Sequence, residues 1–383
     1  MGKKGRQNRA QRSRSHHFVP IWYQRRFLAP GHSKFRILDL KPTIYRRPDG
    51  TVAGESREVM NKGPIEFFCT DDLYTVRLFG EQDDVIERML FGKIDTRGSI
   101  AIPAFLAEDW NLVHTSYFHI FEFMDALRLR TPKGLNFVRR VSRALSQMET
   151  MFAMQDMRTM HCTMWAEGIR EILSAERSSV KFIFSDHPVT FFNRHVFPGD
   201  SGIPAGMDPL IDWKGTQTLF PFDRNNLFVV THEEWVHKTG EGKARQPRTN
   251  ARYFDNSMVR YDDCIRERYL TEDQVRQVNY IIKMRADRYV AGNVDEDLFP
   301  ERHLKTRMWN KLGVFLTPDN RRVPIYGDMV AKFNDGSYYF QDAYGRRPKD
   351  KAEYGKKVVE AERLERQFRE IIAKEDSVKK SHG

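Results

Sequence analysis

The chain has 383 residues and a net charge of +11, with 40% hydrophobic and 30% charged residues. This balance indicates a folded protein of one large or two ordinary domains rather than a disordered chain. There is no apolar stretch of roughly 18 residues to cross a membrane and no apolar run of the secretory kind near the N-terminus.

The cysteines and charges narrow the class of protein further. Three separated cysteines without a C-x-x-C pair argue against disulfides and a thiolate zinc site, so we expect a cytoplasmic protein. Residues 1–14 carry six basic and no acidic side chains, and residues 343–383 carry twelve basic and eight acidic ones. The tails thus hold +6 and +4 of the total +11, and the body is nearly neutral. The arm of residues 1–14 is expected to be disordered. It either binds nucleic-acid phosphates without sequence preference or only aids solubility.

Short strands are expected first along the chain. Residues 34–40 alternate apolar and polar side chains as a strand does, and residues 41–64 form a loop rich in proline, glycine and charge. Residues 67–69 and 73–76 indicate two short strands around a turn.

Helices are expected next. Apolar residues recur on one helical face at 85–94 and every three or four residues at 110–129. Thr131-Pro132 ends the second of these helices, because the residue before proline disfavours helix. A third helix is predicted over residues 135–173.

The remaining sequence predicts strands, one helix and a separate C-terminal part. Four strands are expected at 182–184, 189–192, 218–222 and 227–231, with a long loop at 194–215. Thr271 and Gln274 form a capping-box pattern that begins a helix. Beyond an irregular stretch at 292–302, residues 313–341 suggest a small β-meander, and a charged helix closes the chain.

This order of elements predicts the α+β class, with mixed strands packed on a helical core and a small C-terminal extension of β-meander and helix. We expect three parts: the basic arm 1–14, a main domain 15–295 and the extension 305–383. The sequence lacks dinucleotide-binding, phosphate-loop, nucleophile-elbow and H-E-x-x-H motifs. The triplet Glu241-Gly242-Lys243 lies in a predicted polar loop, so we interpret its similarity to a nuclease motif as chance.

Five motifs follow one another in a recognisable order. They are His16-His17-x-Val19-Pro20 with Trp22-Tyr23 and Arg26-Phe27, Leu129-Arg130-Thr131-Pro132, His161, Ser185-Asp186-His187-Pro188 and Leu219-Phe220-Pro221-Phe222. Over residues 16–291 this order resembles the mostly bacterial family of domain of unknown function 4238. That resemblance implies a relative but no activity, cofactor or ligand.

The motifs supply the candidate site residues. Adjacent His16 and His17 point to opposite sides of an extended strand, although a turn before Pro20 would bring both rings inward. Their structural alternative is packing beside Trp22. His161 lies among methionines, where a histidine is commonly a hydrogen-bonded core residue. Asp186 at a strand end suits a metal ligand, a general base or a group that orients a histidine, and otherwise it closes a local turn.

Two functions remain open from the sequence. In the first, the protein is a hydrolase acting on a phosphate-containing substrate such as nucleic acid. The four catalytic candidates are then His16, His17, His161 and Asp186. Substrate binding is assigned to Arg130, Ser185 and Tyr23, with zinc or manganese as candidate cofactors. In the second, the protein is a nucleic-acid- or protein-binding protein in which these residues are structural.

Overall fold

The structure is a computed structural model that describes residues 15–71, 76–78, 81–83, 91–237, 240–248, 262–323, 329–341 and 347–381. The chain forms two compact units: a larger one, which contains the described residues up to Val323, and a smaller one, which contains those that follow. The predicted arm at 1–14, most of the predicted strand at 73–76 and the first half of the predicted helix at 85–94 lie outside the described residues.

A five-stranded sheet forms the centre of the larger unit. Its order is β11 (Thr190–Phe192), β12 (Gln217–Pro221), β13 (Asn226–Thr231), β9 (Ile169–Ser174) and β14 (Ile265–Tyr269). Neighbouring strands are antiparallel except β14, which runs parallel to β9. Every residue of β12 is buried, so both faces of the sheet are covered.

The larger unit also contains a second sheet, which has four antiparallel strands. Its order is β10 (Phe184–Ser185), β15 (Tyr289–Gly292), β2 (Phe35–Asp39) and β5 (Val59–Lys62). Three two-stranded ribbons accompany it: β1 (Ser15–His17) with β6 (Cys69–Asp71), β3 (Ile44–Arg46) with β4 (Val52–Glu55), and β7 (Val76–Leu78) with β8 (Glu81–Asp83). The turn at 186–189 connects β10, an edge strand of the four-stranded sheet, to β11, an edge strand of the five-stranded sheet.

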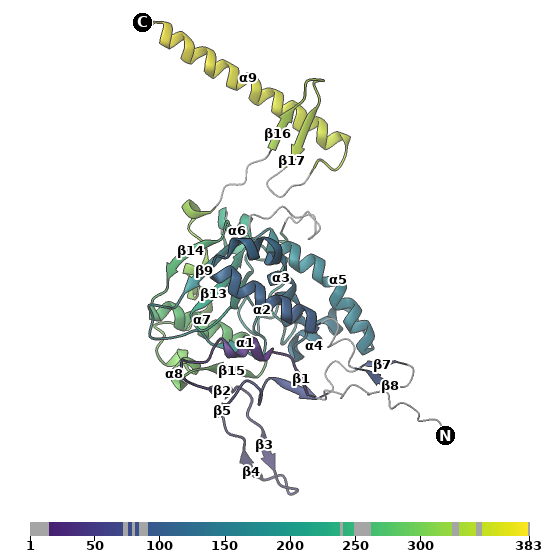
Figure 1. Ribbon diagram of the computed structural model, residues 1–383, viewed down its shortest axis with the longest axis vertical. Helices are drawn as coiled ribbons and strands as arrows, with labels where there is room; N and C mark the ends of the chain where they lie inside the picture. The colour runs from purple at the N-terminus through teal and green to yellow at the C-terminus, as the bar shows by residue number, and fades with distance from the viewer. Residues whose placement is uncertain are drawn as a thin grey trace, which may run out of the picture. The chain divides into compact units, whose positions relative to one another are not determined.

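Helices cover both faces of the five-stranded sheet (Figure 1). One face carries α2 (Gly92–Leu106), α3 (Trp110–Leu129) and α5 (Gln147–Ala166), and the other carries α7 (Glu272–Arg285). Side chains alternate along each strand, so Phe228 meets Phe105 of α2 while Leu227 and Val229 join the apolar cluster of α7. Shorter helices are α1 (Ile21–Arg25), α4 (Pro132–Ser142), α6 (Glu233–His237) and α8 (Asp295–Leu298).

The single helix predicted over 135–173 is wrong. The chain forms α4, then α5, then strand β9. Arg143 takes a left-handed conformation that ends α4, and Ser146 begins α5 through a capping box with Glu149. The predicted helix at 110–129 is confirmed as α3, and the capping box at Thr271 and Gln274 is confirmed at the start of α7.

The larger unit extends beyond the predicted boundary at 305. Residues 313–316, predicted as a strand, contain the 3₁₀ turn Val314–Leu316, and Leu312 and Leu316 are fully buried in the cluster under α7. Further 3₁₀ turns cover Glu241–Lys243, Pro300–Arg302, Trp309–Lys311 and Asn320–Arg322. Residues 305–323 therefore complete the core of the larger unit.

The smaller unit contains a hairpin and a long helix. Strands β16 (Met329–Lys332) and β17 (Tyr338–Gln341) pair antiparallel, and α9 spans Lys351–Ser381. Tyr354 of α9 contacts the hairpin through a hydrogen bond that its hydroxyl accepts from the backbone N–H of Tyr338. The α+β class is confirmed. Of the predicted meander, the last two strands form the hairpin, residues 313–316 belong to the larger unit, and most of the strand expected at 323–326 lies outside the described residues. No helix among the described residues is both long and apolar enough to cross a membrane.

Candidate functional site

A cavity of about 390 Å³ lies in the larger unit where α3 ends, α4 begins and α5 passes beside residues 205–212. Its volume is within the range of small-molecule sites. Its ionisable lining residues include Arg128, Lys133, His161, His187 and Asp208. Much of the remaining wall is apolar and includes Leu129, Phe137, Met157, Phe191 and Ile211. Such a wall with a few convergent polar groups is typical of a ligand site.

The corner between α3 and α4 positions the basic side chains. Thr131 caps α4, because its Oγ1 accepts a hydrogen bond from the backbone N–H of Gly134 at 3.1 Å. Gly134 packs tightly against the end of α3, where an added Cβ would lie 2.7 Å from the carbonyl oxygen of Leu129. The last turn of α3 and the first turn of α4 thus present Arg128 and Lys133 to the same partner.

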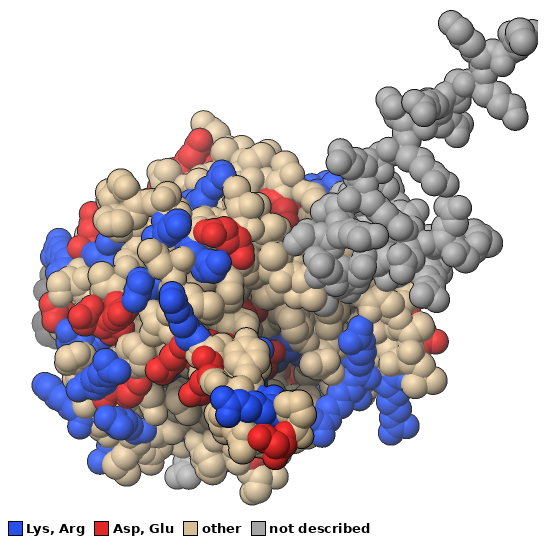
Figure 2. All heavy atoms as spheres, turned by 90° about the horizontal axis from the view of Figure 1, so that it is seen from below, with Lys and Arg blue, Asp and Glu red and all other residues tan. Residues whose placement is uncertain are grey.

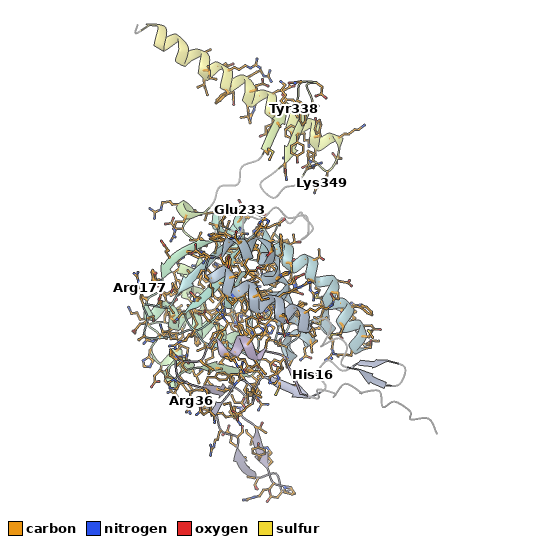
Figure 3. All side chains as sticks on the ribbon, in the orientation of Figure 1. His16, Arg36, Arg177, Glu233, Tyr338 and Lys349 are labelled. Atoms are coloured by element: carbon orange, nitrogen blue, oxygen red, sulfur yellow. The ribbon has the colours of Figure 1, made fainter. Side chains whose placement is uncertain are left out.

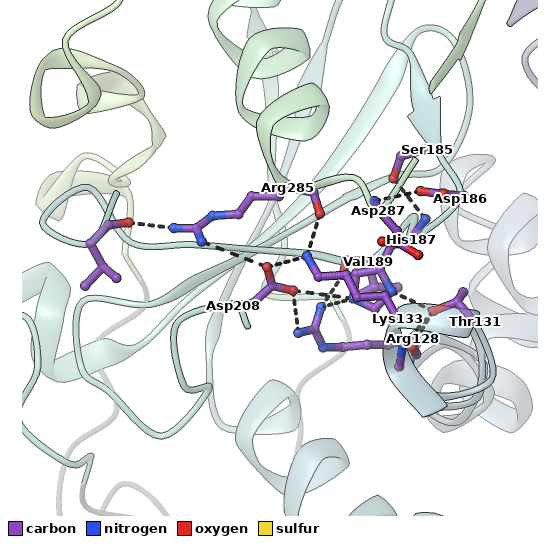
Figure 4. Close-up of polar contacts among 12 residues, drawn as sticks. Arg128, Thr131, Lys133, Ser185, Asp186, His187, Val189, Asp208, Arg285 and Asp287 are labelled. Carbon is purple, nitrogen blue, oxygen red and sulfur yellow. Dashed lines mark hydrogen bonds and ion pairs between the residues drawn. The ribbon is translucent and has the colours of Figure 1, made fainter. Parts of the chain in front are cut away.

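That partner is Asp208, a buried carboxylate from the loop after β11 (Figure 4). Its Oδ2 accepts from Arg128 Nη2 at 3.0 Å and its Oδ1 from Lys133 Nζ at 2.7 Å, with Arg285 Nη1 4.0 Å away. Burial alone raises the pKa of Asp208, but the neighbouring cations Lys133 and Arg128 outweigh it and hold that pKa well below the usual value. Asp208 is therefore ionised at neutral pH.

His187 is held as one neutral tautomer in this cluster. Arg128 can only donate, so its Nη1 gives a hydrogen bond to Nε2 of His187 at 2.9 Å. The ring hydrogen then lies on Nδ1, which is 2.7 Å from Oγ1 of Thr131, and that hydroxyl donates to the carbonyl of Arg128. Burial, followed by the charge of Arg128, lowers the pKa of His187 to about 3.

Around Asp208 three cationic side chains share one carboxylate, while Asp125 and Asp200 also act on Arg128 and Arg285. Arg128, Lys133 and Arg285 surround the single carboxylate of Asp208, and the backbone groups they also contact are neutral. Burial lowers the pKa of Lys133 although Asp208 opposes that change. Unbalanced buried cations cost free energy, and an anion bound at the cavity would offset that cost.

A second polar pair reaches the cavity from α3 and α5. His161 lines the cavity, and its Nδ1 is 2.8 Å from Oδ1 of the buried Asp125. Asp125 precedes Arg128 by three residues on α3, which is about one helical turn. Within the described residues, Nε2 of His161 has no hydrogen-bond partner. An aspartate that orients a histidine in this way leaves Nε2 as the acceptor.

Asp186 and Ser185, both predicted as site residues, close a turn between the two sheets. The carboxylate of Asp186 accepts backbone hydrogen bonds from Asp287 at 2.9 Å, Arg288 at 2.7 Å and Tyr289 at 3.0 Å. Burial raises the pKa of Asp186 to about 6, against these hydrogen bonds. Ser185 Oγ accepts from the backbone N–H of His187 at 3.1 Å. Both side chains therefore hold the backbone that carries His187.

Arg130 and Tyr23, predicted to bind substrate, connect the N-terminal segment to the core. Arg130 donates to the carbonyl of Phe18 at 3.0 Å and pairs with Asp95 at 2.9 Å. Tyr23 is fully buried and donates to the carbonyl of Pro221 at 2.7 Å. Both residues therefore make contacts that stabilise the fold.

His16 and His17 lie in the ribbon β1–β6 (Figure 3 labels His16). His16 is buried opposite Thr70, and His17 opposite Cys69 has its Nε2 3.2 Å from the carbonyl of Ile65. Of the seven residues predicted from the sequence, only His161 lines the cavity. Across the described ranges, no group of three or more His, Cys, Asp or Glu side chains is arranged to hold a metal ion.

Sequence reasoning missed Arg128, Lys133, His187 and Asp208. One signal was available, because Asp125 and Arg128 interrupt the otherwise apolar inner face of α3 at a spacing of three residues. Asp208 gave no such signal, since it lies in an irregular loop without periodicity. Its position depends on contacts with residues that are distant in the chain.

Comparison with known proteins gives one match. A family model described as a protein of unknown function (DUF4238) matches residues 15–296. No curated protein and no solved structure matches the chain. The matched range includes every residue that lines the cavity.

Proposed function

The chain belongs to the DUF4238 family, as the order of its motifs predicted, and we propose that it is a hydrolase whose substrate carries a phosphate group into the α3–α5 cavity. The observation that supports this most directly is that one cavity is lined both by His161, which pairs with the buried Asp125, and by Arg128, Lys133 and Asp208 of the cationic cluster. A general base and an anion-binding group must both reach the same substrate, and one cavity allows this.

The anion-binding step belongs to Lys133 and Arg128. Lys133 Nζ gives two of its three hydrogens to Asp208 and to the carbonyl of Arg285, both at 2.7 Å. The third hydrogen is available for a phosphate oxygen. Arg128 holds Asp208 and His187 in place and adds its charge to the anion site. These residues take the role that the sequence assigned to Arg130.

The proton-transfer step belongs to His161. Asp125 accepts the hydrogen on Nδ1, so Nε2 can take a proton from a water molecule that attacks the phosphorus. The same nitrogen can then return that proton to the leaving oxygen. Arg158 donates to the second oxygen of Asp125 at 3.3 Å and helps to fix the orientation of the carboxylate.

Steady-state rates on a panel of phosphate monoesters and diesters test the proposal. His161→Gln removes the base and is expected to lower kcat by about 10²–10⁴-fold while KM changes little. Asp125→Asn should lower kcat less, because it disturbs only the orientation of the ring. Lys133→Met should raise KM. His119→Gln, a histidine of α3 outside the cavity lining, is the matched control and should leave both constants unchanged.

Circular dichroism and urea unfolding establish that each variant is folded before its rates are compared. A wild-type protein that hydrolyses none of the panel, or a folded His161→Gln variant with full kcat, would refute the proposed hydrolase. In either case anion binding at Lys133 is still measured separately by calorimetry.

A binding function without catalysis is the second candidate. The fold-stabilising contacts of Tyr23, Arg130 and Asp186 favour it. Here the predicted motif residues only stabilise the fold, and residues 1–14 bind nucleic acid through their charge. Deleting residues 1–14 should then abolish salt-dependent binding of an oligonucleotide. Retention of that binding would count against the arm as the binding element.

A further inference from the structure

The cavity has an ordered polarity from its interior to its mouth. Arg128, His187 and Asp208 are 4%, 2% and 7% exposed, so the ionic groups lie at the buried end. Val141 of α4 and Met160 of α5 also line the cavity but are 51% and 46% exposed. Val141 and Met160 therefore place apolar surface at the opening, beside the exposed polar side chains of Asn136 and Arg140, which also line the cavity.

A third exposed apolar side chain borders the cavity. Leu210 lines the cavity and is 39% exposed, and it adds to the apolar border from the loop side. Exposed apolar groups that border a concave site with charges inside indicate an amphiphilic ligand. Its apolar part would cover these side chains, while its charged part would meet the cations.

From this gradient we infer that the ligand is a small amphiphile with one terminal phosphate or carboxylate, which enters anion first and leaves its apolar body against α4 and α5 at the mouth. This inference rests on the proposed function for the role of the cationic cluster, and it specifies the class of substrate. Lys133 binds the terminal oxyanion, and Val141, Met160 and Leu210 contact the body.

The same geometry disfavours an internal phosphodiester. A phosphate within a polynucleotide has a substituent on each side, and both would have to pass the mouth for the phosphate to reach Lys133, whose side chain is only 14% exposed. Polynucleotide binding also needs a basic surface that follows the backbone. Figure 2 shows basic and acidic side chains interspersed over most of the face that it displays.

Calorimetric titration of the full-length protein with inorganic phosphate and with ethyl, butyl and hexyl phosphate tests this inference. Each buried methylene should lower Kd about fourfold, so hexyl phosphate should bind much more tightly than ethyl phosphate. Hexanoate, compared with hexyl phosphate, shows which oxyanion the site prefers. A Kd that stays constant along the series would overturn the inference. It would also be overturned if a thymidine decanucleotide competed with hexyl phosphate for the site and bound with a lower Kd.

Two single-residue variants of helix α5 form a matched pair that tests whether the mouth contacts the ligand. Met160→Gln should raise the Kd of hexyl phosphate severalfold and leave that of inorganic phosphate unchanged. Phe152→Gln replaces an apolar side chain of α5 that is 63% exposed but outside the cavity lining, and it should change neither. Equal effects of both variants would show that the mouth does not contact the ligand.

Binding and turnover separate this inference from the proposed hydrolase. Chain-length-dependent binding without hydrolysis of any ester would retain the amphiphile site and refute catalysis by His161. Hydrolysis of small phosphates with no dependence on chain length would retain the proposed hydrolase and refute the amphiphile site.

Discussion

Two adjacent residues, Asp186 and His187, show how burial acts oppositely on acids and bases. Burial favours the neutral form of each, so it raises the pKa of Asp186 to about 6 and lowers that of His187 to about 3. Asp186 faces the backbone of the turn at 287–289, whereas His187 faces Arg128 and Thr131. The turn between the two sheets therefore combines a structural carboxylate with a ring at the cavity.

Replacing His187 with Gln should remove an acid-sensitive contribution to stability. The unfolded chain binds a proton at the usual pKa of 6.5, but the folded ring does so only near 3. The contribution is therefore complete above pH 6.5 and decreases as the pH falls, by up to about 3 kcal/mol near pH 4. Urea unfolding at pH 7 and at about pH 4.5 should show the free-energy difference between wild type and His187→Gln shrinking with acidification.

Asp186→Asn provides the control of opposite sign. The folded carboxyl takes up its proton near pH 6 and the unfolded one near 3.8, so its contribution grows as the pH falls through that window. The difference between wild type and Asp186→Asn should widen with acidification. If both differences changed in the same direction, the assigned environments of these residues would be wrong.

At the scale of elements, the corner between α3 and α4 sets the geometry of the cavity. Arg128 contacts Asp208 from the end of α3, and Lys133 does so from the start of α4. The two helices are joined by only Arg130 and Thr131, so their approach depends on how closely α4 packs at Gly134. A side chain at that position would meet the backbone carbonyls of Arg128 and Leu129, which cannot move away without disturbing α3.

Gly134→Ala should destabilise the larger unit by about 3 kcal/mol, because the added methyl group overpacks a backbone contact. It should also weaken binding of inorganic phosphate, since Lys133 is displaced with α4. Urea unfolding and calorimetry measure the two effects. Gly54→Ala in strand β4 is the control, because nothing lies within 4 Å of an added Cβ there. A Gly134→Ala variant as stable as Gly54→Ala would contradict the packing argument.

At the scale of the whole molecule, the chain divides after Val323 into two compact units. The larger unit contains the cavity and both large sheets. The smaller unit contains the hairpin and α9, on which Leu364, Phe368 and Ile371 are exposed by 53%, 65% and 54%. The segment at 305–323 belongs to the larger unit because its leucines fill the cluster under α7.

A chain ending at Val323 should unfold at the same temperature as the main transition of the full-length protein. A chain ending at residue 304 loses Leu312 and Leu316, and removing each should cost about 2–5 kcal/mol. Its Tm should be lower by about 10 °C or more. Thermal scans by circular dichroism compare the two chains. Equal Tm values would show that residues 305–323 are dispensable for the larger unit.

Much of the fold could be predicted from local patterns. The periodic face of α3, the capping box of α7 and the alternation of β2 are properties of neighbouring residues. The break between α4 and α5 was missed, although the capping box of Ser146 and Glu149 is also local. In that case apolar periodicity continued across a turn, and it outweighed the capping signal.

Of the candidate site, the sequence by itself indicated His161 and the motifs at 129–132 and 185–188. The tertiary structure decided which polar residues meet. Arg128 and Asp208 are 80 residues apart, and the ion pair between them forms only because the corner of α3 and α4 packs against the loop after β11. Arg130, two residues beyond Arg128, contacts Phe18 and Asp95 instead. Local sequence sets the periodicity of each helix, but the packing of elements determines which of two nearby arginines reaches the cavity.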